Sequence, residues 1–202
     1  MRVGALSVGA LAALAVSLAL PDMSLAGTPC TGHELLSSRR PEGTCLNIAP
    51  QVFEAPDGAL RAIVLPADVS LDTTPDMESR IVIRSRAGDT VMSKDYSSPR
   101  GANGYYVDRA QWSPDAQFFV FSLASSGGHS PWSHPIGVFA RKNARFVAFS
   151  ELIDGGPTLS RDFTFTGPHT VTATTWRHAG ALEDTIPVTV DLEAALSKLP
   201  SE

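Results

Sequence analysis

The stretch QWSPDAQFFVFSL, residues 111–123, carries the strongest indication of how this chain folds. Two segments of strand composition flank Ser113-Pro114-Asp115-Ala116, which has the composition of a tight turn. Pro114 presets φ for the second turn position, and the side chains of Ser113 and Asp115 can hydrogen-bond to their own backbone. The stretch therefore predicts an antiparallel β-hairpin.

The same plan of strand, turn and returning strand recurs along the chain from Arg61 onward. The predicted units are RIVIR-x-R-AGD-TVMSKDY (80–96), IGVFA-RKN-ARFVAFS (136–150) and DFTFT-GPH-TVTATTW (162–176), and IPVTVDL (186–192) adds one more strand. Short segments rich in Val, Ile, Phe and Thr, separated by turn residues, are typical of an all-β sandwich, barrel or propeller. We expect an all-β, antiparallel meander of about 8–9 strands.

Only the segment DLEAALSKL, residues 191–199, has the spacing of a helix. Its Leu and Ala residues form one apolar stripe behind an Asp cap, which predicts a short C-terminal helix. Residues 28–58 and 66–79 contain many Pro, Gly, Asp and Thr residues. We expect both segments to form long loops.

The hairpin at Trp112-Ser113-Pro114-Asp115, followed by an apolar strand ending in Phe121-Ser122, resembles one in a known class of folds. It is similar to the W-S-P-D-G hairpin of exported β-propellers of the Tol type and of WD-repeat-like blades, although Ala116 stands in place of the Gly. The resemblance implies blade-like sheets. A closed propeller takes at least four blades of four strands, and the strands predicted here suffice for about two. We expect two packed, blade-like sheets, a sandwich or partial propeller, with closure by another copy as the alternative.

The N-terminus, Met1–Ala26, has the composition of a signal peptide. Arg2 precedes an apolar stretch from Val3 to Leu20, Pro21 breaks it, and Ser24-Leu25-Ala26 supplies small residues for cleavage. The apolar run, about 18 residues, is long enough for a retained membrane anchor on length alone. Its weak flanking charge and the cleavage signature favour removal instead. We therefore expect an exported chain, periplasmic or secreted, that is soluble after cleavage.

The remaining chain, residues 27–202, is predicted to form a single β domain with a disulfide-tied N-terminal segment. Cys30 and Cys45 are its only cysteines, and such a pair in an exported chain is best interpreted as a disulfide. Loop-closure entropy gives a bridge of this span about 3 kcal/mol of stabilisation. A metal-binding pair is the alternative, but the C-x-x-C spacing is missing and His33 is the only nearby histidine.

Charge and motifs exclude several classes of function. The formal net charge is −5, and the sequence has no run of basic residues, so nucleic acid and anionic lipid are not expected partners. The sequence contains no P-loop, no Rossmann glycine pattern and no G-x-S-x-G elbow. His33-Glu34 begins like a zinc-protease helix, but Ser37 stands where the second ligand belongs. We predict no cofactor and no resident metal.

The segment 125–135, which follows the central hairpin, is the best candidate for a recognition surface. Trp132, framed by prolines, either closes the end of the β core or presents an aromatic face to a partner. Tyr105 and Tyr106 are neighbours in a predicted strand, so one of them must point outward. Beside Trp132, that tyrosine would form an aromatic platform for a sugar or an extended peptide.

Two histidines of this segment permit further interpretations. His129 and His134 could reach one metal ion together with Asp154 or His169, although the spacing does not require it. Ser130 beside His129 has the residue types of a nucleophile and its base, but adjacent side chains diverge. Histidines in loops are more often hydrogen-bonded turn residues, so neither a metal site nor a catalytic site is predicted here.

Two functional hypotheses follow. The leading one is an exported, non-catalytic β domain that binds a protein or glycan of the cell envelope through its loops, with association of identical copies as a further option. Its predicted binding residues are His129, Trp132, His134, Tyr105 and Tyr106. The alternative is a hydrolase acting on a cell-envelope polymer, using His129 with Asp108, Asp115 or Asp154.

Overall fold

The computed structural model describes residues 50–66, 78–98, 103–126, 134–153, 158–176 and 185–200. All of them lie in the larger of the two units into which the chain divides, Thr31–Glu202. The predicted signal peptide and both cysteines lie outside the described residues, so cleavage and the disulfide remain predictions. No helix in the described part of the chain is long and apolar enough to cross a membrane.

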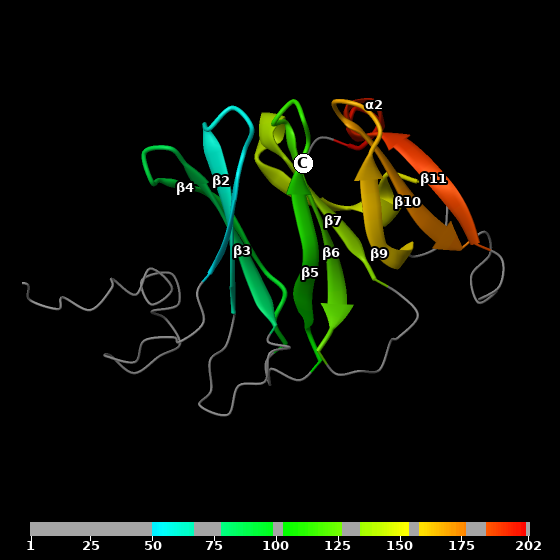
Figure 1. Cartoon of the computed structure of the whole chain (residues 1–202), viewed down its shortest axis with the longest axis horizontal. Helices are drawn as coiled ribbons and strands as arrows, with labels where there is room; N and C mark the ends of the chain where they lie inside the picture. Colours follow the sequence, from blue (N-terminus) through cyan, green and yellow to red (C-terminus); the bar gives the residue numbers. More distant parts are fainter. Residues whose placement is uncertain are drawn as a thin grey trace, which may run out of the picture. The chain divides into compact units, whose positions relative to one another are not determined.

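The described residues form three antiparallel sheets and one short helix (Figure 1). Sheet A contains β1 (Gln51–Glu54), β2 (Leu60–Pro66), β3 (Ser79–Ser85) and β4 (Thr90–Asp95) in that order. Sheet B contains β5 (Tyr105–Trp112), β6 (Phe118–Ser125), β7 (Ile136–Ala140) and β8 (Arg145–Ala148). Sheet C contains β9 (Thr158–Phe165), β10 (Thr170–Trp176) and β11 (Thr185–Asp191), and α2 (Leu192–Leu196) follows it. Short 3-10 turns, η2 (Arg141–Asn143) and η3 (Phe149–Glu151), flank β8.

The predicted all-β, antiparallel fold with a short C-terminal helix is confirmed, but the prediction of two sheets is wrong. Eleven strands in three sheets are described, rather than eight or nine in two. One missed strand, β1, lies inside the predicted loop 28–58. Its residues are mostly exposed and lack strand-like alternation, and it forms because its backbone pairs with β2, from Gln51↔Val64 to Glu54↔Arg61. Pairing with a neighbour, rather than its own side chains, makes this segment a strand.

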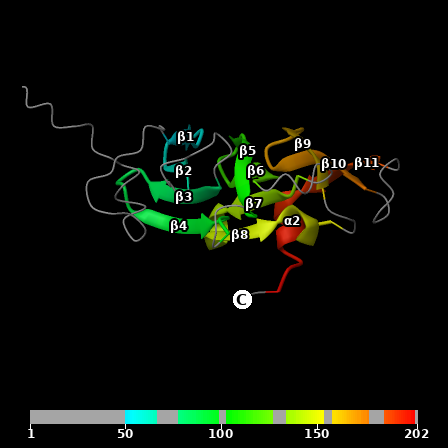
Figure 2. The same ribbon diagram turned by 90° about the horizontal axis from the view of Figure 1, so that it is seen from below.

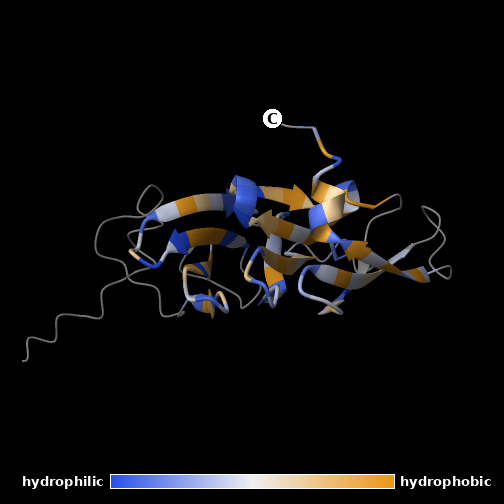
Figure 3. Cartoon of the chain, turned by 90° about the horizontal axis from the view of Figure 1, so that it is seen from above, coloured by the Kyte–Doolittle hydropathy of each residue, from blue (hydrophilic) through white to orange (hydrophobic). Residues whose placement is uncertain are grey.

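Both faces of sheet B are covered by other sheets, because the continuous apolar run of β6 places apolar side chains on both of them. Phe119 and Phe121 pack against sheet A in one core, whereas Phe118 and Val120 pack against sheet C in a second core. All seven residues of β6 from Phe118 to Ala124 are therefore buried. Sheet B lies between sheets A and C (Figure 2). Hydrophilic residues concentrate at the turns that join the strands (Figure 3).

The face of sheet C that points away from sheet B is polar. Thr172 lies opposite Thr189 on one side and opposite Thr164 on the other. The hydroxyls of Thr172 and Thr189 are 2.7 Å apart and hydrogen-bonded. A face of paired hydroxyls is compatible with water, so this sheet needs no further apolar layer to be stable.

The hairpin predicted at residues 113–116 is present between β5 and β6. The buried Ser113 hydroxyl accepts hydrogen bonds from the backbone N–H groups of Gln117 and Phe118 at 3.1 and 2.9 Å. Ala116 has a φ of 60°, in the left-handed region that favours glycine. The turn therefore forms with an alanine in this conformation.

A buried carboxylate fixes the opposite end of sheets A and B. Glu78, 3% exposed, accepts hydrogen bonds from the Ser98 backbone N–H at 2.6 Å, from the Ser126 hydroxyl at 2.7 Å, and from the Gly104 N–H. A Cβ on Gly104 would lie 2.5 Å from the Tyr96 carbonyl oxygen, so only glycine fits there. Burial raises the pKa of Glu78, but the hydrogen bonds from Ser126, Gly104 and Ser98 outweigh it and lower the pKa below its ordinary value.

Candidate functional site

Three of the five predicted binding residues lie in the described part of the chain, at the Glu78 end of sheet B. Tyr105 begins β5 and pairs with Ser125 at the end of β6, and Tyr106 pairs with Ala124. Tyr105 packs against the core shared with sheet A, so alternation along β5 turns Tyr106 to the other face. His134 precedes β7 at this end and is half-buried. His129 and Trp132 lie outside the described residues, so the aromatic platform remains a prediction.

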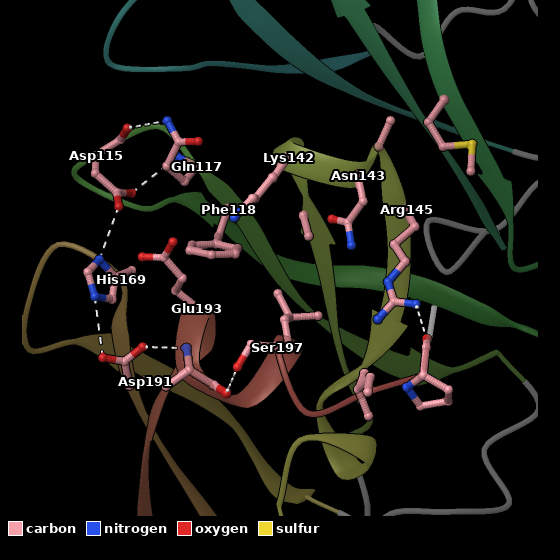
Figure 4. A pocket seen from close by; sticks show the side chains of 17 residues that line it. Asp115, Gln117, Phe118, Lys142, Asn143, Arg145, His169, Asp191, Glu193 and Ser197 are labelled. Atoms are coloured by element: carbon pink, nitrogen blue, oxygen red, sulfur yellow. Dashed lines mark hydrogen bonds and ion pairs between the residues drawn. The ribbon is translucent and has the colours of Figure 1, made fainter. Parts of the chain in front are cut away.

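The clearest pocket lies at the opposite end, among three hairpin turns and α2 (Figure 4). Its volume is ≈ 960 Å³, at the upper end of the range of small-ligand pockets. Its polar lining consists of Asp115, Gln117, Lys142, Asn143, Arg145, His169, Asp191, Glu193 and Ser197. Its apolar lining includes Met92, Phe118, Ala140, Ala144, Leu196 and Leu199.

Asp115 belongs to the β5–β6 turn, and its two carboxylate oxygens have different partners. Oδ1 accepts hydrogen bonds from the Ser113 hydroxyl at 2.5 Å and from the Gln117 backbone N–H at 3.1 Å. Oδ2 faces Nδ1 of His169, in the β9–β10 turn, at 3.3 Å. The carboxylate therefore joins the turn of sheet B to the turn of sheet C.

The two carboxylate oxygens of Asp191 also have different partners. Oδ1 caps α2 by accepting the Ala194 backbone N–H at 2.9 Å, and Oδ2 faces Nε2 of His169 at 3.3 Å. The Ala194 N–H and the neighbouring imidazole both lower the pKa of Asp191. The backbone N–H of Leu192 also donates to the carbonyl of His169 at 3.0 Å. The helix is thus attached directly to the β9–β10 turn.

His169 is held at both ring nitrogens by Asp115 and Asp191, as Figure 4 shows. Each ring nitrogen faces a carboxylate oxygen at 3.3 Å, so neither is directed at a nucleophile in the pocket. This arrangement joins three chain segments: the β5–β6 turn, the β9–β10 turn and the start of α2.

Charged side chains on two sides of the pocket remain unpaired. Lys142 and Arg145 lie on the η2–β8 segment, and Glu193 lies on α2 beside Asp191 (Figure 4). Among the residues that the structure describes, Lys142, Arg145 and Glu193 form no ion pair. The pocket therefore has an acidic side and a basic side, both with unused charge.

The sequence indicated Asp115 as a turn residue and candidate hydrolase carboxylate, and His169 as a candidate metal ligand, but did not place the two together. Asp191 was expected only as a helix cap, and Glu193, Lys142 and Arg145 were not singled out. One signal could have joined them: in a meander, alternate turns lie at the same end of the sheet. The β5–β6, β7–β8 and β9–β10 turns are alternate turns, so their polar residues gather at one end.

Two of the three carboxylates proposed for the hydrolase have other partners. Asp115 faces His169, and Asp108 lies 3.7 Å from Nη1 of Arg161 on β9. His129 and Asp154 lie outside the described residues. His134 and His169 lie at opposite ends of sheet B, and within the described part of the chain no group of three or more His, Cys, Asp or Glu side chains could hold a metal ion.

No protein-family model matches this sequence, and no curated protein matches it either. The function is therefore argued from the geometry of the pocket.

Proposed function

We propose that this chain is an exported, non-catalytic β domain that binds a protein partner of the cell envelope in the pocket beside α2. The observation that carries the proposal is the unpaired charge on both sides of the pocket, from Glu193 and from Lys142 and Arg145. Unpaired charged groups that line an open pocket, on elements fixed by the fold, are suited to complementary charges of a partner.

Two further features support binding rather than catalysis. The imidazole of His169 has both nitrogens occupied by carboxylates. The hydroxyl of Ser197, which lines the pocket, donates to the Ala194 carbonyl at 2.8 Å and is therefore already engaged. A nucleophile next to a free base, the arrangement that acyl transfer requires, does not occur among the lining residues.

The test is capture of a partner from envelope extract by the mature chain and by matched variants. The pocket variant carries Arg145→Glu and Glu193→Lys, which reverses both sides while the net charge stays constant. The control carries Arg86→Glu and Glu54→Lys, two exposed residues outside the pocket. We expect the wild type and the control to retain the same partner and the pocket variant to lose it, with all three unfolding at the same urea concentration.

A third variant compares this pocket with the predicted recognition segment. Trp132→Ala alters residues 125–135 and leaves the pocket unchanged. Loss of the partner with Trp132→Ala, together with full retention by the pocket variant, would move the binding site to that segment and contradict the proposal.

Export is proposed on the sequence alone. N-terminal sequencing of protein recovered outside the cytoplasm should give Gly27 as the first residue. A non-reducing peptide map should then join Cys30 to Cys45. An intact Met1 on the exported protein would contradict cleavage at this position.

A further inference from the structure

We infer that the pocket recognises a peptide segment carrying a carboxylate at one end and an ammonium or guanidinium group at the other, with apolar side chains between them. The inference rests on the proposed function and names the chemistry of the partner segment. Arg145 is assigned to the carboxylate of the ligand, and Glu193 is assigned to its cation.

Arg145 is the first argument for an anionic group in the ligand. Its Nε is buried and has no hydrogen-bond partner among the described residues. Among the described residues, its Nη1 donates to the Pro200 carbonyl alone, at the long distance of 3.5 Å. A guanidinium presents its N–H groups as a fork that matches a carboxylate. Nε itself is shielded from solvent, so a ligand carboxylate would meet the Nη groups at the tip of this half-buried side chain.

Lys142 strengthens the basic side. It is exposed, lies three residues before Arg145 on the same β7–β8 connection, and has no ion-pair partner among the described residues. Its flexible ammonium group can approach the same carboxylate as the second positive charge.

The acidic side is suited to a cation. Asp115 and Asp191 each direct one oxygen to a backbone N–H and the other to His169, so their hydrogen-bonding capacity is largely used. Glu193 lies next to them, and its carboxylate has no ion pair among the described residues. Three carboxylates and one imidazole leave this side negative whether His169 is neutral or charged. A ligand ammonium would face Glu193.

Apolar side chains line the same pocket and are assigned to the middle of the ligand. They include Phe118, Ala140, Ala144 and Leu196. These side chains favour apolar residues of the ligand over a polar linker. The combination of two opposite charges and an apolar centre distinguishes this pocket from a simple anion or cation site.

The test uses blocked synthetic peptides titrated into the mature wild-type chain, with binding measured by calorimetry. Each peptide has an acetylated N-terminus, an amidated C-terminus, one Lys and one Glu. Two, three or four apolar residues, each Leu or Ala, separate the Lys from the Glu. Companion peptides carry Gln in place of Lys, of Glu, or of both. For the best spacer we expect the peptide with both charges to bind about tenfold more tightly than either companion with one charge.

Protein variants then assign each charge. With Arg145→Gln, we expect the tenfold preference for Glu over Gln in the peptide to disappear while the preference for Lys over Gln remains. With Glu193→Gln, we expect the reverse. Arg86→Gln and Glu54→Gln, outside the pocket, serve as controls and should leave both preferences unchanged. Loss of the preference for Glu in Glu193→Gln, or of the preference for Lys in Arg145→Gln, would overturn the assignment.

Two outcomes separate this inference from the proposed function. If the pocket variant loses the captured partner but no peptide shows a preference for its charges, the inference is wrong and the proposed function stands. If the pocket variant retains the partner, both are wrong. Titration with 6-aminohexanoate adds a small dipolar probe; binding to it that is as tight as to the best peptide would overturn the assignment to a peptide segment.

Discussion

Two carboxylate sites at opposite ends of the sheets differ in how completely their hydrogen bonds are satisfied. Glu78 is buried and accepts several hydrogen bonds from backbone and hydroxyl groups. Glu193 is exposed in the pocket and has no ion-pair partner among the described residues. A saturated, buried carboxylate contributes to stability, whereas an unsaturated, accessible one is available to a partner. The same type of side chain therefore has a structural role at one end and a proposed binding role at the other.

The largest expected effect is the removal of the Glu78 carboxylate. Glu78→Ala leaves the N–H groups of Ser98 and Gly104 and the Ser126 hydroxyl without their acceptor. Breaking a buried, charged network of this kind costs about 4 kcal/mol. Urea unfolding should show the loss, and Glu54→Ala on the exposed edge strand should change stability by less than about 0.5 kcal/mol. Equal stability of the two variants would refute the structural role of Glu78.

The next largest loss of stability is expected for Leu192→Ala, at the pocket end of sheets B and C. Leu192, the first residue of α2, is completely buried in the core shared by sheets B and C. Leu192→Ala should reduce the free energy of unfolding by about 3 kcal/mol, from lost burial and the cavity left behind. Peptide binding should weaken with it, because α2 carries Glu193. Unchanged binding would show that the position of α2 does not matter to the pocket.

A smaller effect should appear in the pH dependence of stability. Because the pKa of Glu78 is lower in the folded chain, its contribution is fully present above the unfolded-chain value of 4.5 and is lost as the pH falls through the folded value. Unfolding midpoints measured from pH 7 to pH 3 should therefore fall less steeply for Glu78→Gln than for the wild type. Asp57 and Asp95, whose pKa values are also lowered, should keep some slope in the variant.

The smallest effect on stability is expected for Glu193→Gln. This substitution removes a carboxylate that has no ion pair among the described residues, so the urea midpoint should stay within error of the wild type. The comparison with Glu78→Gln is direct, because the chemical change is identical. A destabilisation as large as that of Glu78→Gln would show that Glu193 also has a structural role.

The sequence was sufficient to predict the strands whose own residues have the composition and spacing of a strand. The run FFVFSL predicted a strand, and Ser113-Pro114-Asp115 predicted its turn. The run did not show that both faces of its sheet are buried, because periodicity alone does not tell what covers a strand. Strand β1 could not be predicted either, since its formation depends on pairing with β2.

The pocket and the Glu78 network depend on distances between segments that are far apart in the sequence. Glu78 fell in a predicted loop, and its partners Ser98, Gly104 and Ser126 are 20 to 48 positions away. Asp115 and His169 are 54 positions apart and meet only because sheets B and C pack face to face. A single sequence contains the residues of such a site but not their proximity.

Sheet B belongs to two cores at once, and this makes the domain indivisible. A fragment lacking residues 158–200 would expose Phe118, Val120 and Val138 to water, and a fragment lacking residues 50–98 would expose Phe119 and Phe121. Either truncation produces an aggregation-prone surface of aromatic and aliphatic side chains. Shortened versions of this chain for expression or crystallisation should therefore keep all three sheets together.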